Sequence, residues 1–188
     1  MGTYFLKKSA KNVYWSVYGR TVRNPGLPSH GESILFVCKG NICRSPFAEK
    51  IAARYSNSPK RFSFGSAGIR VEDPKPSPID AIIAAKSFGV DLQDHASRRI
   101  GYESMESYDL IAVMETWQYR YLRNLFLEFR EKIILLPLFE NNDGISRDRY
   151  SIYNIKDPYG KNMDEYYDCF ARIEKCIAGL FHRIDSGK

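Results

Sequence analysis

A cysteine, an arginine and a serine stand close together after an apolar run in the first quarter of the chain. The apolar residues 34–37 lead into Cys38, and Arg44 and Ser45 follow within seven positions. Residues 47–55 then have apolar side chains at helical spacing. This order predicts a strand, a tight loop and a helix, with backbone N–H groups of the loop directed at one centre. Such an arrangement binds a tetrahedral oxyanion.

The side chains of this loop fit nucleophilic chemistry on a phosphate ester. A cysteine beside a helix N-terminus and an arginine is expected to be a thiolate at neutral pH, so Cys38 is the candidate nucleophile. The planar guanidinium of Arg44 can bind two phosphoryl oxygens at once. Ser45 can donate a hydrogen bond to the sulfur and help it to leave. We therefore call residues 38–45 the phosphate loop.

The residues inside the phosphate loop suit a backbone that wraps around an anion. Gly40 allows conformations that a side chain would obstruct, and Asn41 tolerates a positive φ angle. The alternative is a cysteine that is only a small buried apolar residue, but the strand before it and the helix after it argue against this. No Gly-Lys-Ser/Thr follows Gly40, which excludes a Walker-type loop. The candidate substrate-binding positions in the loop are Lys39, Gly40, Asn41, Ile42, Cys43 and Ser45.

The segment 34–46 closely resembles the signature of the low-molecular-weight protein tyrosine phosphatases. Four further segments resemble that family in the same order along the chain, so that the likeness covers about residues 33 to 184. They are Ser66-Ala67-Gly68, His95-Ala96-Ser97-Arg98-Arg99-Ile100, the strand-like Tyr108-Asp109-Leu110-Ile111-Ala112-Val113-Met114, and Asp157-Pro158-Tyr159-Gly160.

The resemblance implies that Asp157 is the general acid. A phenolate is a poor leaving group and needs a proton, and the charge of thiolate and phosphate would keep this carboxyl protonated in the complex. Asp157 would then accept a proton from water while the cysteinyl phosphate is hydrolysed. It lies in an expected loop, and Pro158 restricts its backbone. An ordinary Asp-Pro turn is the alternative.

The resemblance also implies a cleft and a supporting network. Tyr159 is expected to form one wall of the cleft, where its ring can flank a phenyl group. The opposite wall should come from the segment after Gly68, but residues 69–72 lack the aromatic side chain that many relatives have there. The opposing wall therefore stays open. The side chains that match the family's loop-supporting hydrogen bonds are Asn41, Ser45, Ser66 and His95.

Alternating strands and helices predict an α/β fold with a parallel sheet covered on both faces and the site at the strand carboxyl ends. The resemblance implies a three-layer sandwich with four strands in the order 2-1-3-4. We expect strands at 34–37, 61–66, 108–114 and 132–136, an irregular stretch at 139–159 and a last helix at 163–184. Two further helices are expected at 78–88, capped by Ser77, and at about 116–129, capped by Thr116.

We expect two parts in the chain: an N-terminal extension at 1–32 and a phosphatase domain at 33–188. The extension is basic and aromatic, with about +4 of the formal net charge of +6. It either forms a short helix around residues 13–18 or is flexible. Packing on the domain, binding a partner and lying on an anionic membrane surface all remain open.

Composition excludes several classes of protein. The remaining charge of about +2 is small for a nucleic-acid-binding protein and no base-reading motif is present, so no nucleic-acid partner is expected. The apolar runs are too short for a transmembrane segment. Polar and aromatic residues interrupt any signal peptide, so a cytoplasmic location is expected. We also expect a monomer or weak dimer.

The four cysteines allow more than one interpretation. Cys38 and Cys43 share a tight loop, so a reversible disulfide between them could protect the nucleophile from overoxidation. Cys169 and Cys176 are expected in the core, on one face of the last helix. A zinc site of all four is improbable, because the chemistry needs no metal. We expect no cofactor and no metal.

The main functional hypothesis is a protein tyrosine phosphatase that acts through a cysteinyl phosphate. Its partners would be tyrosine-phosphorylated proteins and, by analogy with bacterial members, an autophosphorylated tyrosine kinase of polysaccharide export. Three alternatives use the same fold: an arsenate reductase, which needs two further relay cysteines, a phosphoarginine phosphatase, and a non-catalytic phosphotyrosine-binding protein. Arginine phosphatases favour a threonine where this chain has Ile42, which favours an aryl phosphate.

Overall fold

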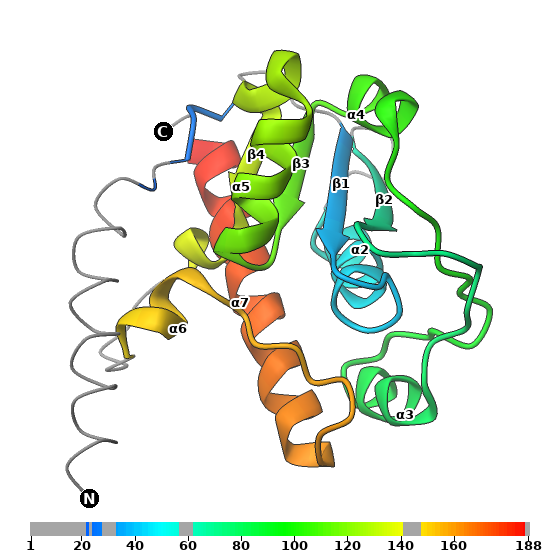
Figure 1. Ribbon diagram of the computed structural model, residues 1–188. Coiled ribbons are helices and arrows are strands. Elements are labelled where there is room, and N and C mark those ends of the chain that lie inside the picture. Colours follow the sequence, from blue (N-terminus) through cyan, green and yellow to red (C-terminus); the bar gives the residue numbers. More distant parts are fainter. Residues whose placement is uncertain (1–21, 23, 28–32, 57–61, 141–147, 187–188) are drawn as a thin grey trace, which may run out of the picture.

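The centre of the molecule is a four-stranded parallel sheet with helices on both faces (Figure 1). The computed structural model describes residues 22, 24–27, 33–56, 62–140 and 148–186. The strands are β1 (Ser33–Cys38), β2 (Ser63–Gly68), β3 (Leu110–Val113) and β4 (Ile133–Leu135), in the order β2-β1-β3-β4. The predicted fold class and strand order are confirmed. The helix expected at residues 13–18 lies outside the described residues.

The strands are apolar on both faces, as parallel strands between two helical layers must be. In β1, Ile34 and Phe36 face one core and Leu35 and Val37 face the other. Cys38 pairs with Gly68 at the end of β2, and Val37 pairs with Val113 at the end of β3. This register brings the carboxyl ends of three strands to one edge of the sheet.

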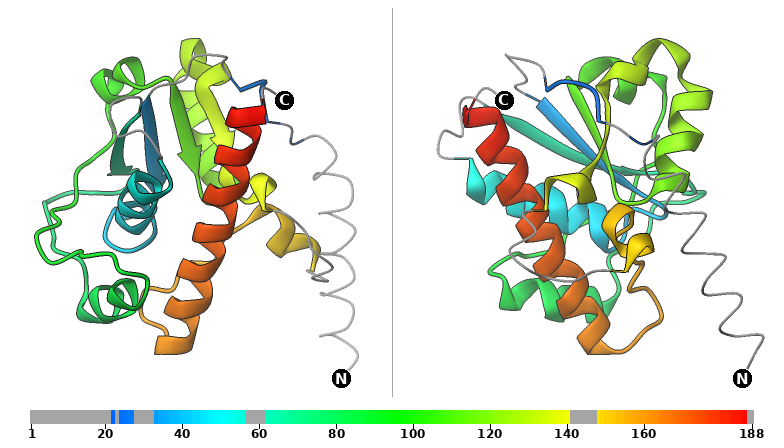
Figure 2. Two further views of the ribbon diagram at one scale, coloured as in Figure 1. Left: turned by 180° about the vertical axis from the view of Figure 1, so that it is seen from behind. Right: turned by 90° about the vertical axis from the view of Figure 1, so that its left-hand side faces the viewer.

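Helices of different lengths form the two outer layers (Figure 2). The core on one face includes side chains of α2 (Arg44–Tyr55), α3 (Ile79–Ser87) and the long α7 (Met163–Ser186). The core on the other face includes side chains of α4 (Tyr102–Ser107) and α5 (Thr116–Leu125). None of the described helices is both long and apolar enough to span a membrane.

Both predicted helix caps were wrong. Helix α3 has Pro78 as its N-cap, and the hydroxyl of Ser77 is buried with no hydrogen-bond partner among the described residues. Helix α5 begins at Thr116 itself, with Glu115 as the N-cap. The Thr116 hydroxyl instead donates to Asn154 Oδ1 at 2.9 Å, because this part of the chain packs against the segment that follows α6 and gains a tertiary hydrogen bond there.

Two predicted boundaries also differ from the structure. Helix α5 ends at Leu125 and a 3₁₀ helix follows at Leu127–Lys132, where one longer helix was expected. The fourth strand ends at Leu135 and is followed by a 3₁₀ helix at Leu136–Phe139. The stretch 139–159, expected to be irregular, contains the short α6 (Arg149–Tyr153). Helix α6 is capped by Asp148, whose side chain accepts from the Ser151 N–H at 2.8 Å. Short helices with such local caps leave little apolar periodicity in a sequence.

Candidate active site

The phosphate loop starts where β1 ends and closes around the sulfur of Cys38. The Asn41 N–H donates to Cys38 Sγ at 3.2 Å, and Ser45 Oγ lies 3.1 Å from the same sulfur. Asn41 has a φ of 53°, the left-handed conformation that turns the chain back toward the nucleophile. Helix α2 follows directly, so its N-terminal N–H groups and positive dipole end lie beside the thiol.

The side chain of Asn41 connects the phosphate loop to its surroundings. Its Nδ2 donates to Ser45 Oγ at 2.9 Å, and its Oδ1 accepts from the Arg98 N–H at 2.9 Å. The carbonyl of Asn41 lies 2.6 Å from His95 Nε2. Ser66 is close through its backbone carbonyl, which accepts from Arg98 Nε at 2.7 Å. The structure thus brings His95 to the loop directly and connects Ser66 to it only through Arg98, which the sequence analysis did not select.

Gly68 ends β2 directly against the phosphate loop. A Cβ at this position would lie 2.9 Å from the Asn41 nitrogen and 2.9 Å from the Gly40 carbonyl carbon. Both contacts are to backbone, so a side chain here would displace the loop. The neighbouring Ala67 carbonyl accepts from Ser45 Oγ at 3.3 Å. The end of β2 therefore packs against the phosphate loop on the side away from the pocket and limits where the loop can lie.

Arg44 is almost completely buried, with 1% of its surface exposed. Its Nη1 donates to Glu115 Oε1 at 2.7 Å and to the Ile155 carbonyl at 2.9 Å, and its Nη2 lies 2.7 Å from Asp157 Oδ2. Burial alone would lower the pKa of Arg44, but the charges of Cys38, Asp157 and Glu115 raise it above its ordinary value. Arg44 Nε is buried and has no partner within the described residues. The guanidinium is thus fixed by protein contacts through three of its five N–H donors, which leaves Nε–H and the second N–H of Nη2 for a ligand.

Glu115 is a site residue that the sequence analysis missed. It follows the end of β3, at the same sheet edge as Cys38, and its carboxylate is 12% exposed. The signal was available, because an acidic residue directly after a buried strand of a parallel sheet lies at the site edge. Glu115 holds the guanidinium of Arg44 from the side.

Asp157 lies in the loop between α6 and α7, which we call the Asp157 loop (residues 154–160). Its side chain is 37% exposed, against 1% for Arg44. The Ile155 N–H donates to the Met114 carbonyl at 2.9 Å, which fastens the start of this loop to the end of β3. Tyr159 is 60% exposed near the other end of the loop. The Asp157 loop thus reaches the site from solvent.

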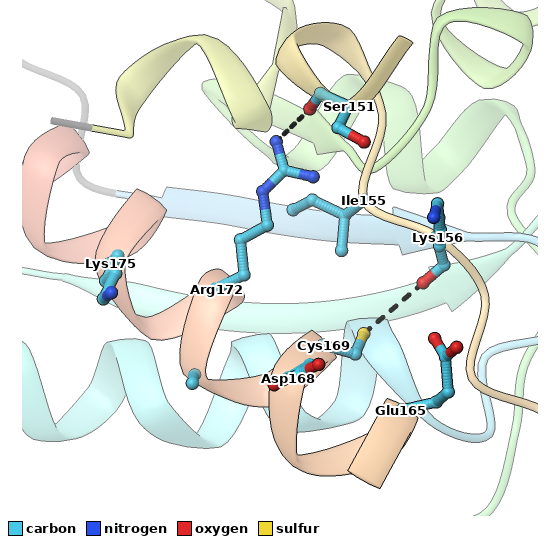
Figure 3. Close-up of a pocket in the computed structure, with 9 residues that line it drawn as sticks. Ser151, Ile155, Lys156, Glu165, Asp168, Cys169, Arg172 and Lys175 are labelled. Atoms are coloured by element: carbon cyan, nitrogen blue, oxygen red, sulfur yellow. Dashed lines mark hydrogen bonds between the residues drawn. The ribbon is translucent and has the colours of Figure 1, made fainter. Parts of the chain in front are cut away.

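Helix α7 supports the Asp157 loop from below (Figure 3). Arg172 donates from Nε to Glu140 Oε2 at 3.0 Å and from Nη1 to the Asn154 carbonyl at 2.6 Å. Its Nη2 donates to the Ser151 carbonyl. Cys169 Sγ also lies 3.5 Å from the Lys156 carbonyl. A buried arginine therefore joins α6, the Asp157 loop and α7.

A pocket of about 310 Å³ opens over the phosphate loop. The predicted site residues that line it are Cys38, Lys39, Gly40, Ile42, Cys43, Arg44, Asp157 and Tyr159. The remaining lining residues form the wall opposite Tyr159, which is mainly polar and charged and has no aromatic side chain. They are Arg70, Val71, Glu72, Asp73, Lys75 and Ser97. Asn41 and Ser45 lie behind the loop, where they hold it.

The other three cysteines are buried, and within the described residues none of them forms a disulfide. Burial, and then the charge of Cys38, raise the pKa of the Cys43 thiol well above its usual range. Burial raises the pKa of Cys169 to about 12. Within the described residues no cluster of His, Cys, Asp or Glu side chains could hold a metal ion.

Residues 33–188 match the family described as low molecular weight phosphotyrosine protein phosphatase. The chain belongs to this family. It is 31% identical to the low molecular weight protein-tyrosine-phosphatase Wzb of Escherichia coli K12, over 76% of this chain and 88% of that protein. The predicted class, a phosphoric monoester hydrolase of the protein-tyrosine-phosphatase type, is confirmed for the family.

Two solved structures place the fold in the same group. Wzb of Vibrio vulnificus in complex with benzylphosphonate is 29% identical, with a TM-score of 0.69 over 81% of this chain and 99% of that one. A YwlE arginine phosphatase with a phosphorylated active-site serine is 26% identical, with a TM-score of 0.68 over 83% of this chain and 97% of that one.

Proposed function

We propose that this protein hydrolyses phosphotyrosine in proteins through a phosphorylated Cys38. The observation that supports this most directly is the arrangement around Arg44. Its Nη2 contacts Asp157 at 2.7 Å, its Nε is unpartnered, and the same pocket contains the sulfur of Cys38. Nucleophile, anion-binding donors and a carboxyl group thus converge on one centre of about the size of a phosphoryl group.

In the first step the phosphoryl group displaces the Asp157 carboxylate from Arg44, and the displaced carboxylate takes up a proton from solvent. The phosphate loop N–H groups and Arg44 hold its oxygens, and the Cys38 thiolate attacks phosphorus. As the bond from phosphorus to the tyrosine oxygen breaks, the carboxyl of Asp157 gives its proton to that oxygen. Tyrosine leaves and a cysteinyl phosphate remains.

In the second step water attacks the cysteinyl phosphate. Asp157, now a carboxylate, takes a proton from this water, and the bond from sulfur to phosphorus breaks. Ser45 Oγ, 3.1 Å from the sulfur, can donate a hydrogen bond that stabilises the returning thiolate. Inorganic phosphate leaves and the enzyme is restored.

The roles of the other predicted residues follow from their places. Lys39, Gly40, Ile42 and Cys43 line the pocket over the phosphate loop, and Tyr159 is exposed at its rim, where its ring can flank the substrate phenyl group. His95, together with Asn41 and the Ser66 carbonyl, holds the loop in shape. These groups support the reaction without transferring a proton.

The buried cysteines argue against arsenate reduction. A relay needs thiols that become thiolates and reach the nucleophile, whereas Cys169 has its pKa raised to about 12 and Cys176 is fully buried in α7. The side chain of Ile42 in the pocket favours an aromatic substrate over phosphoarginine. Catalysis, rather than phosphotyrosine binding alone, is supported because nucleophile, arginine and acid are all present.

We further propose that the physiological substrates are tyrosine-phosphorylated proteins in the cytoplasm, among them an autophosphorylated tyrosine kinase of polysaccharide export. The relatives named as protein-tyrosine-phosphatases support the class of substrate. The extension at 1–32, a monomeric or weakly dimeric state and a Cys38–Cys43 disulfide remain predictions.

The decisive experiment compares phosphotyrosine, phosphoarginine and arsenate as substrates of the purified protein. We expect turnover of phosphotyrosine peptides, inhibition by vanadate, and a phosphorylated Cys38 after rapid acid quenching. The Cys38→Ser variant should lose at least about 10⁴-fold in kcat. Rapid phosphoarginine hydrolysis with none of phosphotyrosine would refute the proposal.

A further inference from the structure

A second hollow, of about 260 Å³, adjoins the active-site pocket. It is lined by Lys39, Arg70, Glu115, Trp117 and Asp157. Lys39, Arg70 and Asp157 also line the pocket over the phosphate loop, so the two hollows border each other. A substrate residue close to the phosphotyrosine can therefore reach the second hollow while the phosphoryl group is bound.

The two cations of this hollow are held in place by the fold. The Arg70 N–H donates to the Lys39 carbonyl at 2.8 Å, and the Ile69 N–H donates to the Cys38 carbonyl at 3.1 Å. The segment after β2 is thereby fixed along the start of the phosphate loop. The Arg70 guanidinium carbon lies 5.6 Å from the ring centroid of Trp117, which is within range of a cation–π interaction. Lys39, Arg70 and Trp117 form what we call the Arg70 subsite.

The charge balance of this hollow favours an anion. Its two carboxylates, Glu115 and Asp157, share the single positive charge of Arg44, which each contacts at 2.7 Å. With Lys39 and Arg70 this makes three cations against two carboxylates, a formal net charge of +1. In the part of the chain that the structure describes, neither Lys39 nor Arg70 forms an ion pair with a carboxylate.

We propose that the Arg70 subsite binds an anionic side chain next to the phosphotyrosine, so that the preferred substrates have an acidic or second phosphorylated residue beside it. This inference rests on the proposed function and deepens it. Glu72 and Asp73 line the active-site pocket but not the second hollow, so the preference for an anion belongs to the side of the substrate that faces this hollow. An extended peptide advances about 3.3 to 3.6 Å per residue, which places the partner residue within about three positions.

The test is a set of phosphotyrosine peptides that differ at one flanking position. Glutamate, a second phosphotyrosine, alanine, phenylalanine or lysine is placed one to three residues away on either side. We expect kcat/KM at low salt to be about three- to tenfold higher for the glutamate peptide than for the alanine peptide on one side only. The doubly phosphorylated peptide should exceed it, and the advantage should shrink in 0.5 M salt.

Charge reversal makes the test independent of any change in overall activity. In Arg70→Glu the ratio of the glutamate to the lysine peptide should invert, and in Arg70→Gln it should approach one. Trp117→Leu should weaken the preference and Trp117→Phe should retain most of it, because the ring fixes the guanidinium. The matched control is Lys50→Glu, which makes the same charge change on the exposed face of α2 and should leave the ratios unaltered.

The outcomes separate this inference from the proposed function. Activity without any flanking preference, an equal gain from phenylalanine, or the same inversion in Lys50→Glu would each overturn the Arg70 subsite while leaving the phosphatase intact. Absence of activity toward every phosphotyrosine peptide would refute the proposed function itself.

Discussion

The phosphate loop and the Asp157 loop meet at Arg44 but are built in opposite ways. Most residues of the phosphate loop are buried, and hydrogen bonds that involve Asn41, Ser45 and Arg98 hold it. The Asp157 loop is reached by solvent and is held mainly at its base, where Arg172 and the end of β3 contact it. The phosphate loop is therefore held firmly, whereas Asp157, the proposed proton donor, lies on a segment with fewer contacts. The comparison predicts that damage to the cradle affects all substrates and damage to the Asp157 loop affects only those with poor leaving groups.

The largest effect is expected for Arg44→Lys. An ammonium group cannot contact Glu115, the Ile155 carbonyl and two phosphoryl oxygens together, because it lacks the planar fork of the guanidinium. We expect kcat/KM to fall about 10³-fold for phosphotyrosine peptides and for p-nitrophenyl phosphate alike, measured by steady-state kinetics. A loss confined to one substrate would contradict the comparison.

Asp157→Asn should discriminate between leaving groups. Without an acid the loss for a phosphotyrosine peptide should be about 10² to 10³-fold in kcat, and for p-nitrophenyl phosphate, whose phenol is acidic, about tenfold or less. The measurement is kcat for a series of aryl phosphates whose phenols differ in pKa. In Asp157→Asn, kcat should depend more steeply on the phenol pKa than in the wild-type protein. An unchanged slope would argue against proton transfer by this residue.

Gly68→Ala should disturb the cradle without removing any functional group. The new Cβ would lie 2.9 Å from the backbone of the phosphate loop, so the loop must shift. We expect kcat/KM to drop about tenfold for every substrate, with weaker vanadate inhibition. Gly101→Ala is the matched control, since nothing lies within 4 Å of a Cβ there, and both variants are compared by kinetics and by urea unfolding.

The smallest catalytic effect is expected for Arg172→Gln, which loosens the base of the Asp157 loop. Glu140, 4% exposed at its side chain, loses its ion pair with Arg172, so the free energy of unfolding should fall by about 3 kcal/mol, measured by urea denaturation. Turnover of phosphotyrosine should fall a few-fold and that of p-nitrophenyl phosphate hardly at all. The double variant Arg172→Met with Glu140→Leu should recover much of the stability. An equal loss for both substrates would show that Arg172 affects activity in some other way than by positioning Asp157.

The sequence predicted the phosphate loop better than its surroundings, and the reason is physical. The structure of residues 38–45 depends on residues that are close in sequence, because a strand, a turn and a helix N-terminus follow one another there. Cys38, Arg44 and Asp157 were selected and do converge in the structure, and the fold class and strand order were confirmed. Whether they act as proposed is left to the kinetics above.

What the sequence did not predict depends on contacts between distant segments. Glu115 and Arg98 acquire their places only when β3 and the segment after His95 come to the same edge of the sheet. Ser77 and Thr116 have the residue types of helix caps, but the backbone is fixed by other packing, and Thr116 contacts Asn154 instead. Residue types alone also could not predict that residues 70–73 form a wall of the pocket, because Trp117, which contacts Arg70, is distant in sequence.

The contact between Arg44 and Asp157 means that every incoming phosphate mimic competes with a tethered carboxylate. Measured inhibitor affinities will therefore be lower than the intrinsic strength of the cradle, by the free energy needed to separate that pair. A phosphonate with an attached ammonium arm, placed to receive the displaced carboxylate, would recover part of that loss and should be a tighter inhibitor than the phosphonate alone.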